Sequence, residues 1–392
     1  HRWKILRKPL VVTDCELGVV WRLAFARGVA FAPPRALCMK GGDMVRSEDY
    51  WDIMRPLSYN CLYNFFIGSR GTGKTYGSLK YCIEQYLKWK AKGVPWEFVY
   101  VRRREEELKK ITKQKRGRIF QAVQREFPEH ILSAESNTLY CDGEVMGYAV
   151  QLSCADQALK GDSFPNVRLI IFDEFITAKK GNGGYLPDEV RIFNDLYESI
   201  ARPGTDHPRV IVLFLSNAVS ITNPYFDYYH LDKPYNGDIQ RFGKTKNILV
   251  QNVVCEKIRQ AKLATEFYQL NADSEYLDYA VNNEWLLDNE DFIEKKTQRS
   301  QYRLTLHYKG TDIGVWVDPV QWRYYISLNV DPTCSAYYSV TTDDHKPNVM
   351  LFKAAKQLPW LKHLREAYEC GAVYYESMKL KNWFRDIMRM CG

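Results

Sequence analysis

Residues 62–76 read Leu-Tyr-Asn-Phe-Phe-Ile-Gly-Ser-Arg-Gly-Thr-Gly-Lys-Thr-Tyr. The first six are apolar or aromatic apart from Asn64 and predict a buried strand, whereas residues 74–90 predict a helix. Between them, residues 68–75 fit the pattern G-x-x-x-x-G-K-[ST] in the strand–loop–helix context that this pattern requires. The sequence therefore predicts a loop that binds the phosphates of a nucleotide.

The residue types of this loop suit ATP and Mg²⁺. Glycines let backbone N–H groups turn toward phosphate oxygens, and the helix N-terminus adds a partial positive charge. We expect Lys74 to neutralise the β- and γ-phosphates and Thr75 to bind Mg²⁺ through its hydroxyl. Arg70 has either a phosphate or coupling role, or a solvated position. The expected nucleotide-binding residues are Gly68, Ser69, Arg70, Gly71, Thr72, Gly73, Lys74 and Thr75.

A second motif, at residues 169–174, is an apolar strand that ends in two acids, Asp173 and Glu174. We expect Asp173 to bind Mg²⁺, directly or through water, and Glu174 to polarise the attacking water. Glutamate beside aspartate favours an ATPase that activates water over a small-molecule kinase, which must exclude water. Solvated acids at an ordinary strand end are the alternative, and the phosphate-binding loop upstream weakens it.

A third candidate is Asn217, which follows the apolar run at residues 213–215. A polar side chain at the tip of a buried strand beside the phosphate-binding loop is well placed to sense the γ-phosphate. A structural role in the turn is the alternative.

Apolar segments that alternate with helical ones predict an α/β domain of the P-loop (ASCE/RecA-like) type, with a mainly parallel sheet. From residue 301 an alternating aromatic pattern predicts a β-meander, followed by two helices. We expect an ATPase domain at 44–238, a helical linker at 239–293 and a C-terminal domain at 294–392. The expected strands lie near 62–67, 97–101, 138–141, 148–152, 167–172 and 210–215, and the expected helices near 74–90, 105–127, 187–200, 254–285, 360–370 and 380–390.

Charge and cysteine content limit the classes of protein to consider. The formal net charge is +8, and residues 102–118 carry nine Lys/Arg against three Asp/Glu. Arginines 102–104 open this basic stretch and either contact nucleic-acid phosphates or lie on a solvated helix face. No apolar run reaches transmembrane length. The ten cysteines show no zinc-binding spacing, which favours reduced thiols in a cytosolic protein.

Residues 1–43 carry eight Lys/Arg against three Asp/Glu and lack a clear period. They end in Lys-Gly-Gly-Asp, which a purine-rich ribosome-binding site could encode, directly before Met44. We expect 1–43 to be a non-native leader, with a genuine N-terminal extension as the alternative.

From residue 59 onward the chain resembles the DNA-encapsidation ATPases of small, protein-primed tailed phages, a terminase-like motor family. The phosphate-binding loop alone is unspecific, but the matching segments occur in one order along the chain. They are residues 64–76, 98–103, 164–167, 170–176, 215–220, 223–226, 314–318 and 341–344.

This resemblance implies a ring of identical subunits, pentameric in the family, docked on the portal of a procapsid in the host bacterial cytoplasm. ATP hydrolysis would drive double-stranded DNA inward. Arg202 matches the arginine finger that a neighbouring subunit supplies, and Lys160 matches a second base acting in trans. One residue is inserted near position 183, so Arg191 and Arg209 are alternatives to Arg202. The partners implied are double-stranded DNA, the portal and procapsid and, as an open alternative, a packaging RNA, with no membrane.

The resemblance also implies a degenerate RNase H-like C-terminal domain. A working nuclease of that fold needs clustered carboxylates that hold two metal ions, and the family lacks such a cluster. We expect this domain to bind DNA, the portal or RNA through basic residues near the C-terminus. The candidate acids are Asp312, Asp318, Asp343 and Asp344, and the basic residues are Lys379, Lys381, Arg385 and Arg389.

Two other functions remain open at this point. One is another P-loop nucleic-acid motor, such as a helicase or a replication-linked ATPase, although helicase motifs are not evident. The other is a scaffold that binds ATP without turnover, which the combination of Lys74, Asp173 and Glu174 disfavours.

Overall fold

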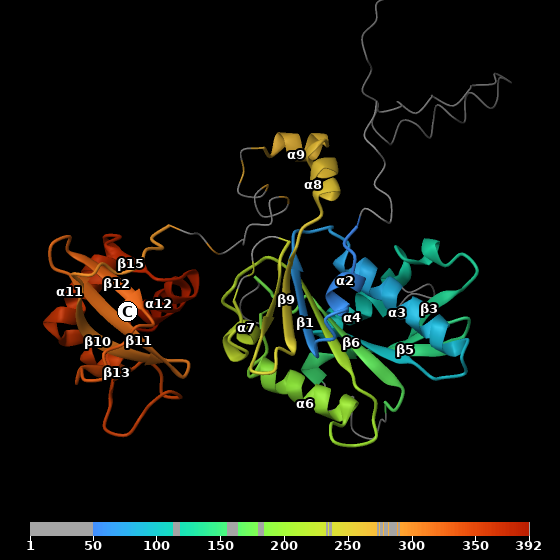
Figure 1. Cartoon of the computed structure of the whole chain (residues 1–392), viewed down its shortest axis with the longest axis horizontal. Helices are drawn as coiled ribbons and strands as arrows, with labels where there is room; N and C mark the ends of the chain where they lie inside the picture. The colour runs from blue at the N-terminus through green and yellow to red at the C-terminus, as the bar shows by residue number, and fades with distance from the viewer. Residues whose placement is uncertain are drawn as a thin grey trace, which may run out of the picture. The chain divides into compact units, whose positions relative to one another are not determined.

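The computed structural model describes residues 50–391 apart from 113–117, 155–163, 179–183, 233, 235–236, 273, 275–276, 278–280, 282–287 and 289–290. The expectation for residues 1–43 therefore lies outside the described residues. Two sheets are present, one of nine strands and one of six (Figure 1). Within the described residues, no helix is both long and apolar enough to cross a lipid bilayer.

The nine-stranded sheet has the order β3-β4-β5-β2-β6-β7-β1-β9-β8. The six strands from β5 to β9 in this order pair in parallel, and β3, β4 and β8 join through antiparallel pairing. This confirms the predicted mainly parallel α/β fold. The strands are β1 (Tyr63–Gly68), β2 (Glu97–Arg102), β3 (Leu132–Glu135), β4 (Thr138–Cys141), β5 (Glu144–Gln151), β6 (Val167–Asp173), β7 (Ile211–Asn217), β8 (Ile239–Phe242) and β9 (Ile248–Val253).

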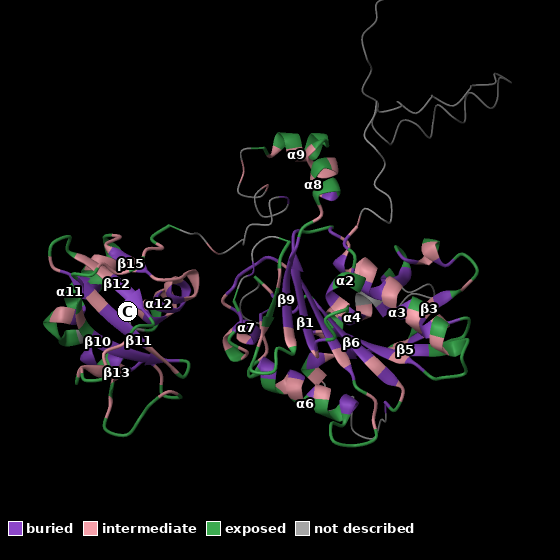
Figure 2. Cartoon of the chain, in the orientation of Figure 1, coloured by how far each residue is buried: buried purple, intermediate pink, exposed green. Residues whose placement is uncertain are grey.

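Helices cover both faces of this sheet, so its central strands are buried on both sides (Figure 2). Neighbouring strand residues point to opposite faces. Phe65 accordingly packs in the core under α6 and α7, and Phe66 packs in the core under α3 and α4. The helices are α2 (Met54–Leu57), α3 (Lys74–Lys90), α4 (Glu105–Thr112), α6 (Glu189–Ala201) and α7 (Pro224–Tyr228).

Aromatic rings fill the core on the α6 face. The rings of Phe65 and Phe214 stack with centroids 4.2 Å apart, and Phe193 of α6 packs 4.8 Å from Phe214. All three side chains have no exposed surface. Such rings each bury a large apolar area, so this cluster holds β1 and β7, two of the strands that carry the expected site residues, against α6.

One expectation about local structure was wrong, and two features were not anticipated. The basic stretch at 105–127 is not one helix: α4 ends at Thr112, and residues 118–127 form two 3₁₀ turns at Arg118–Phe120 and Gln124–Glu126. Strand β3 was not anticipated. The large sheet also continues past the expected domain boundary at residue 238, because β8 and β9 belong to it. The division into three domains otherwise stays a prediction.

The six-stranded sheet has the order β14-β13-β10-β11-β12-β15. Strands β10 to β12 form the predicted antiparallel meander, and β13, β14 and β15 extend it by parallel pairing. With its covering helices this is the expected RNase H-like α+β fold. Its elements are β10 (Gln301–Tyr308), β11 (Thr311–Asp318), β12 (Arg323–Ser327), β13 (Tyr337–Ser339), β14 (Met350–Leu351), β15 (Val373–Tyr375), α11 (Pro359–Glu369) and α12 (Met378–Cys391).

In the sequence, α8 (Glu256–Leu263) and α9 (Glu266–Leu270) come after β9 and before β10. Both helices are polar, as the sequence predicted for the segment after residue 254. Only Ile258 of α8 is buried, and α9 buries no residue.

We predict that Phe214→Ala lowers the free energy of unfolding by roughly 3–5 kcal/mol, because it leaves a cavity among packed rings. Urea unfolding followed by tryptophan fluorescence would measure the change. Ile131→Ala is the control, since that side chain is 74% exposed. Equal stabilities of the two variants would contradict the importance assigned to the ring cluster.

Candidate nucleotide-binding and hydrolysis site

The phosphate-binding loop connects β1 to α3, and three of its glycines are required by geometry. Gly71 and Gly73 have φ of +81° and +90°, which side chains other than glycine rarely adopt. A Cβ on Gly68 would overlap the carbonyl oxygen of Val253, and one on Gly73 would lie 2.8 Å from the Tyr50 ring. The loop is therefore held closely from outside by neighbouring segments.

Lys74 is buried and turns back over the loop. Its Nζ donates to the carbonyl oxygens of Gly68 and Ser69, at 3.0 and 2.9 Å, and to the Thr72 hydroxyl at 3.1 Å. All three acceptors are neutral, and burial lowers the pKa of the Lys74 ammonium to about 7 despite the attraction of Asp173. A phosphate anion would supply the missing negative charge, which is the role expected for this lysine.

The strand order brings the other expected residues to the same edge of the sheet. In the parallel register, Gly68 at the end of β1 lies beside Asn217 of β7, and Asp173 of β6 lies beside Leu215 of β7. Ligands of open α/β sheets bind at the carboxyl ends of the strands. Asn217 is thus next to the phosphate-binding loop, as predicted, and its role as a γ-phosphate sensor stays a proposal.

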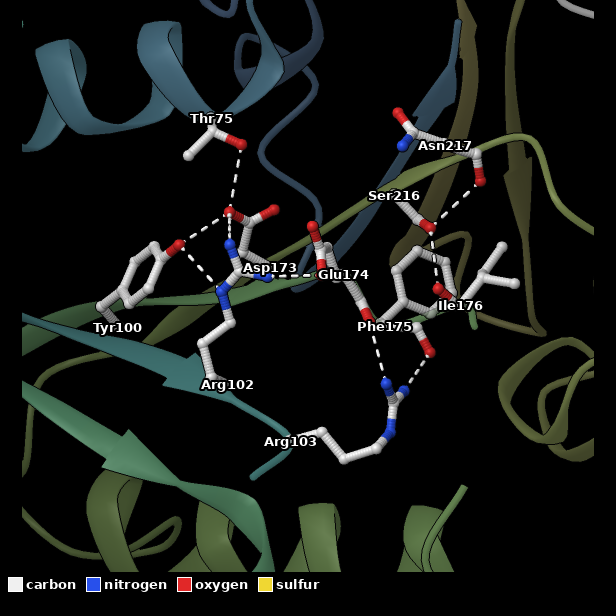
Figure 3. A network of polar contacts seen from close by, with 10 residues as sticks. All are labelled: Thr75, Tyr100, Arg102, Arg103, Asp173, Glu174, Phe175, Ile176, Ser216 and Asn217. Carbon is white, nitrogen blue, oxygen red and sulfur yellow. Dashed lines mark hydrogen bonds and ion pairs between the residues drawn. The ribbon is translucent and has the colours of Figure 1, made fainter. Parts of the chain in front are cut away.

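Asp173 is 5% exposed and accepts three hydrogen bonds on one oxygen (Figure 3). Its Oδ2 lies 3.1 Å from the Thr75 hydroxyl, 2.7 Å from the Tyr100 hydroxyl and 3.1 Å from Arg102. Thr75 and Asp173 thus present two oxygen atoms side by side, the donor chemistry that Mg²⁺ prefers. Burial and the nearby Asp173 charge raise the pKa of Tyr100, so its hydroxyl stays a donor.

Glu174 begins the loop after β6 in a left-handed conformation, with φ of +61°. Its backbone N–H donates to the Leu215 carbonyl at 2.8 Å, and its carboxylate lies 2.8 Å from the Arg102 guanidinium. The side chain is 59% exposed. The strained backbone turns this carboxylate away from the core, where it can meet a water molecule.

Arg103 neither contacts solvent on a helix face nor is available to nucleic acid, the two alternatives expected from the run of basic residues. It is 3% exposed and forms a bidentate pair with Glu189, at 2.7 and 3.0 Å. It also donates to the carbonyl oxygens of Glu174 and Phe175 (Figure 3). With Arg102 engaged by the two acids, neither arginine is available to nucleic-acid phosphates. The position of these arginines at the end of the predicted strand 97–101 was a sign that they face the edge of the sheet where ligands bind.

The remaining basic candidates differ in what they contact. Arg202 follows the last residue of α6 and is exposed, as a residue acting on a neighbouring subunit must be. Arg209 donates to the side chain and carbonyl of Asn60, at 2.5 and 2.8 Å. Arg191 is 71% exposed and lies beside Asp188, which precedes α6, and Asp195 of α6. Lys160 lies outside the described residues, and Arg70 is exposed on the loop.

Two of the candidate acids of the C-terminal domain support turns. Asp318 accepts two backbone N–H bonds and one from a threonine hydroxyl, and Asp344 does the same at another turn. Asp312 accepts from Tyr337 and pairs with a histidine. Among the described residues of this domain, no three His, Cys, Asp or Glu side chains come within metal-binding distance of one another.

We predict that ATP binding at pH 8 takes up a proton at Lys74. With a pKa of about 7, Lys74 is mostly the uncharged amine at this pH before nucleotide binds. The phosphates would raise that pKa and restore the charge. Calorimetric titration in buffers of different ionisation enthalpy measures the uptake. A binding enthalpy that is the same in all buffers at pH 8 would contradict the prediction, and at pH 6 the Lys74 contribution should vanish.

Comparison with known proteins identifies one family over most of the chain. Residues 45–391 match the model of the podovirus DNA encapsidation protein (Gp16) family. The DNA packaging protein of Bacillus phage phi29 is 33% identical over 87% of this chain and 97% of its own length, and that of Bacillus phage B103 is 35% identical over 83% and 96%.

Solved structures agree. A chain of the bacteriophage phi-29 genome packaging motor assembly is 31% identical, with a TM-score of 0.68, over 88% of this chain and 99% of that one. The Phi-28 gp11 DNA packaging motor, 19% identical with a TM-score of 0.57 over 88% of this chain and 98% of that one, shares the fold. The chain therefore belongs to the podovirus DNA encapsidation protein (Gp16) family.

Proposed function

We propose that this chain is the ATP-hydrolysing motor subunit that drives double-stranded DNA into a phage procapsid. The observation that carries the proposal is the convergence of Lys74, Asp173 and Glu174 at one sheet edge, in a chain that belongs to a DNA encapsidation family. In this proposal the subunits form a ring, pentameric as in the resemblance, that docks on the portal in the host bacterial cytoplasm. A packaging RNA remains an open partner.

The chain's own residues divide the work of hydrolysis. Lys74 and the loop N–H groups hold the phosphates, and Glu174 orients and polarises the attacking water. Thr75 and Asp173 would hold Mg²⁺, which neutralises charge on the phosphate oxygens when bound. Asn217 would sense the γ-phosphate, and its position beside Gly68 supports this role.

Arg102 positions both acids of the site in this proposal. Its guanidinium lies 3.1 Å from Asp173 and 2.8 Å from Glu174, with the arginine side chain only 15% exposed. The pair engages one oxygen of the Glu174 carboxylate, Oε2, in a side chain that is 59% exposed. In this proposal Arg102 positions Glu174, and the rest of the carboxylate meets the attacking water.

The neighbouring subunit completes the site. Arg202 would enter it from the next subunit and stabilise charge on the transferred phosphoryl group, with Lys160 as a second base acting in trans. The exposure of Arg202 supports this role.

We predict that Glu174→Gln lowers DNA-stimulated ATP turnover roughly 100-fold or more, since it removes the group that polarises water. Nucleotide binding should persist, because Lys74 and Thr75 are unchanged. ATPase rates with and without double-stranded DNA would be measured beside Glu135→Gln, an exposed glutamate on β3. Wild-type turnover in Glu174→Gln would exclude the proposed mechanism. Turnover indifferent to DNA would argue against a motor that works on free DNA.

We also predict that Arg202→Ala subunits mixed into wild-type rings abolish cooperative hydrolysis, because an arginine finger contributes roughly 10³-fold or more to the rate. ATP binding by the variant should match the wild type. Arg55→Ala, an exposed arginine on α2, is the control. Loss of ATP binding in Arg202→Ala would instead indicate a role within the subunit's own site or in folding.

A further inference from the structure

Strand β9 delivers helix α8 to the phosphate-binding loop. β9 pairs in parallel with β1, and its last residue, Val253, lies beside Gly68, the first residue of the loop. Helix α8 begins three residues later, at Glu256. The Sγ of Cys255, which precedes α8, lies 3.6 Å from the Thr72 carbonyl oxygen. The start of the linker is therefore fixed to the loop by both chain connection and contact.

Lys262, near the end of α8, reaches the same loop. Its Nζ donates to the Arg70 carbonyl oxygen. A Cβ placed on Gly71 would lie 3.5 Å from its Cε and 3.7 Å from its Nζ, so the side chain lies directly against the loop at this glycine. The helix thus contacts the loop at Thr72 through its start and at Arg70 and Gly71 through its end.

These contacts gather like charges. Lys262 and Arg70 repel each other, and Lys262 also disfavours the charge on Lys74. Burial, followed by the repulsion from Arg70, lowers the pKa of Lys262. The acceptor of its bond on the loop is a neutral carbonyl. Cations that converge on a partly desolvated loop are stabilised when an anion joins them, and phosphates are the anions this loop is shaped to hold.

We propose that Lys262 is a second phosphate-binding lysine: it leaves the Arg70 carbonyl and contacts the terminal phosphate of the bound nucleoside triphosphate. The inference rests on the proposed function, since it needs a nucleotide in the loop. A flexible lysine side chain carries the compact charge that such a contact requires. Because Lys262 belongs to α8, this contact would connect nucleotide binding in the loop to the linker as well as to the ATPase domain.

The test is equilibrium binding of a fluorescent non-hydrolysable ATP analogue and of the matching ADP analogue to the full chain. Lys262→Met should weaken triphosphate binding roughly tenfold, the loss expected for one hydrogen bond to a charged group, and diphosphate binding by less than about threefold. Lys262→Arg should restore most of the triphosphate affinity. Lys257→Met, on the same helix and exposed, is the matched control and should bind both analogues as the wild type does.

Three results would overturn the inference. They are unchanged triphosphate binding in Lys262→Met, an equal loss for both analogues, and a loss accompanied by a lower melting temperature that Lys262→Arg does not rescue. Lys74→Met separates this outcome from failure of the proposed function. If wild type and Lys74→Met bind the triphosphate equally poorly, both fail. If only Lys74→Met loses binding, the site stands and the role of Lys262 does not.

Discussion

A buried carboxylate must be paired, and the pairing of Asp173 organises the site. Asp173 ends β6, one of the innermost strands, where water cannot solvate its charge. Tyr100 and Arg102 of the neighbouring strand β2 and Thr75 of α3 supply the donors. The consecutive elements α3 and β2 thereby meet the distant strand β6 at one oxygen atom. The parallel register places them there, because parallel strands end at the same edge of a sheet.

Neighbouring segments of the chain also constrain the phosphate-binding loop. Tyr50 packs on Gly73, Val253 packs on Gly68, and Cys255 contacts Thr72. A loop that is held in its binding conformation before the ligand arrives loses less conformational entropy on binding. The glycines are thus required for two reasons: the φ angles of the loop, and the closeness of the segments that fix those angles.

The sequence predicted the parts of the structure that depend on local pattern. The apolar run before Gly68 and the helix from Lys74 to Lys90 follow from spacing and from the glycine-rich turn between them. The aromatic alternation likewise predicted β10 to β12. Strands β13, β14 and β15 have only two or three residues each, too few to show any period. β13 and β15 form on the two edges of the meander, and β14 forms on β13.

Partners of charged side chains could not be predicted in the same way. Arg103 stands in a run of positive charge, yet its bidentate partner Glu189 is far away in the sequence. Composition reports a density of charge but not which charges the fold encloses. The same limit applies to β8 and β9, whose membership of the large sheet depends on the pairing of β9 with β1 rather than on their own residues. The residues that meet at the sheet edge as expected came from motifs that contain their own structural context.

The pairing of Arg103 with Glu189 has a mechanical consequence. Glu189 is the first residue of α6, and Arg103 also holds the carbonyl of Glu174. Helix α6 has 13 residues, and at 1.5 Å per residue it is a rigid rod about 20 Å long whose far end carries Arg202. Through Arg103, the loop at Glu174 is therefore connected to the first residue of α6, and Arg202 follows the last residue of the same helix. One buried arginine thus connects the exposed carboxylate of Glu174 to the helix that positions Arg202.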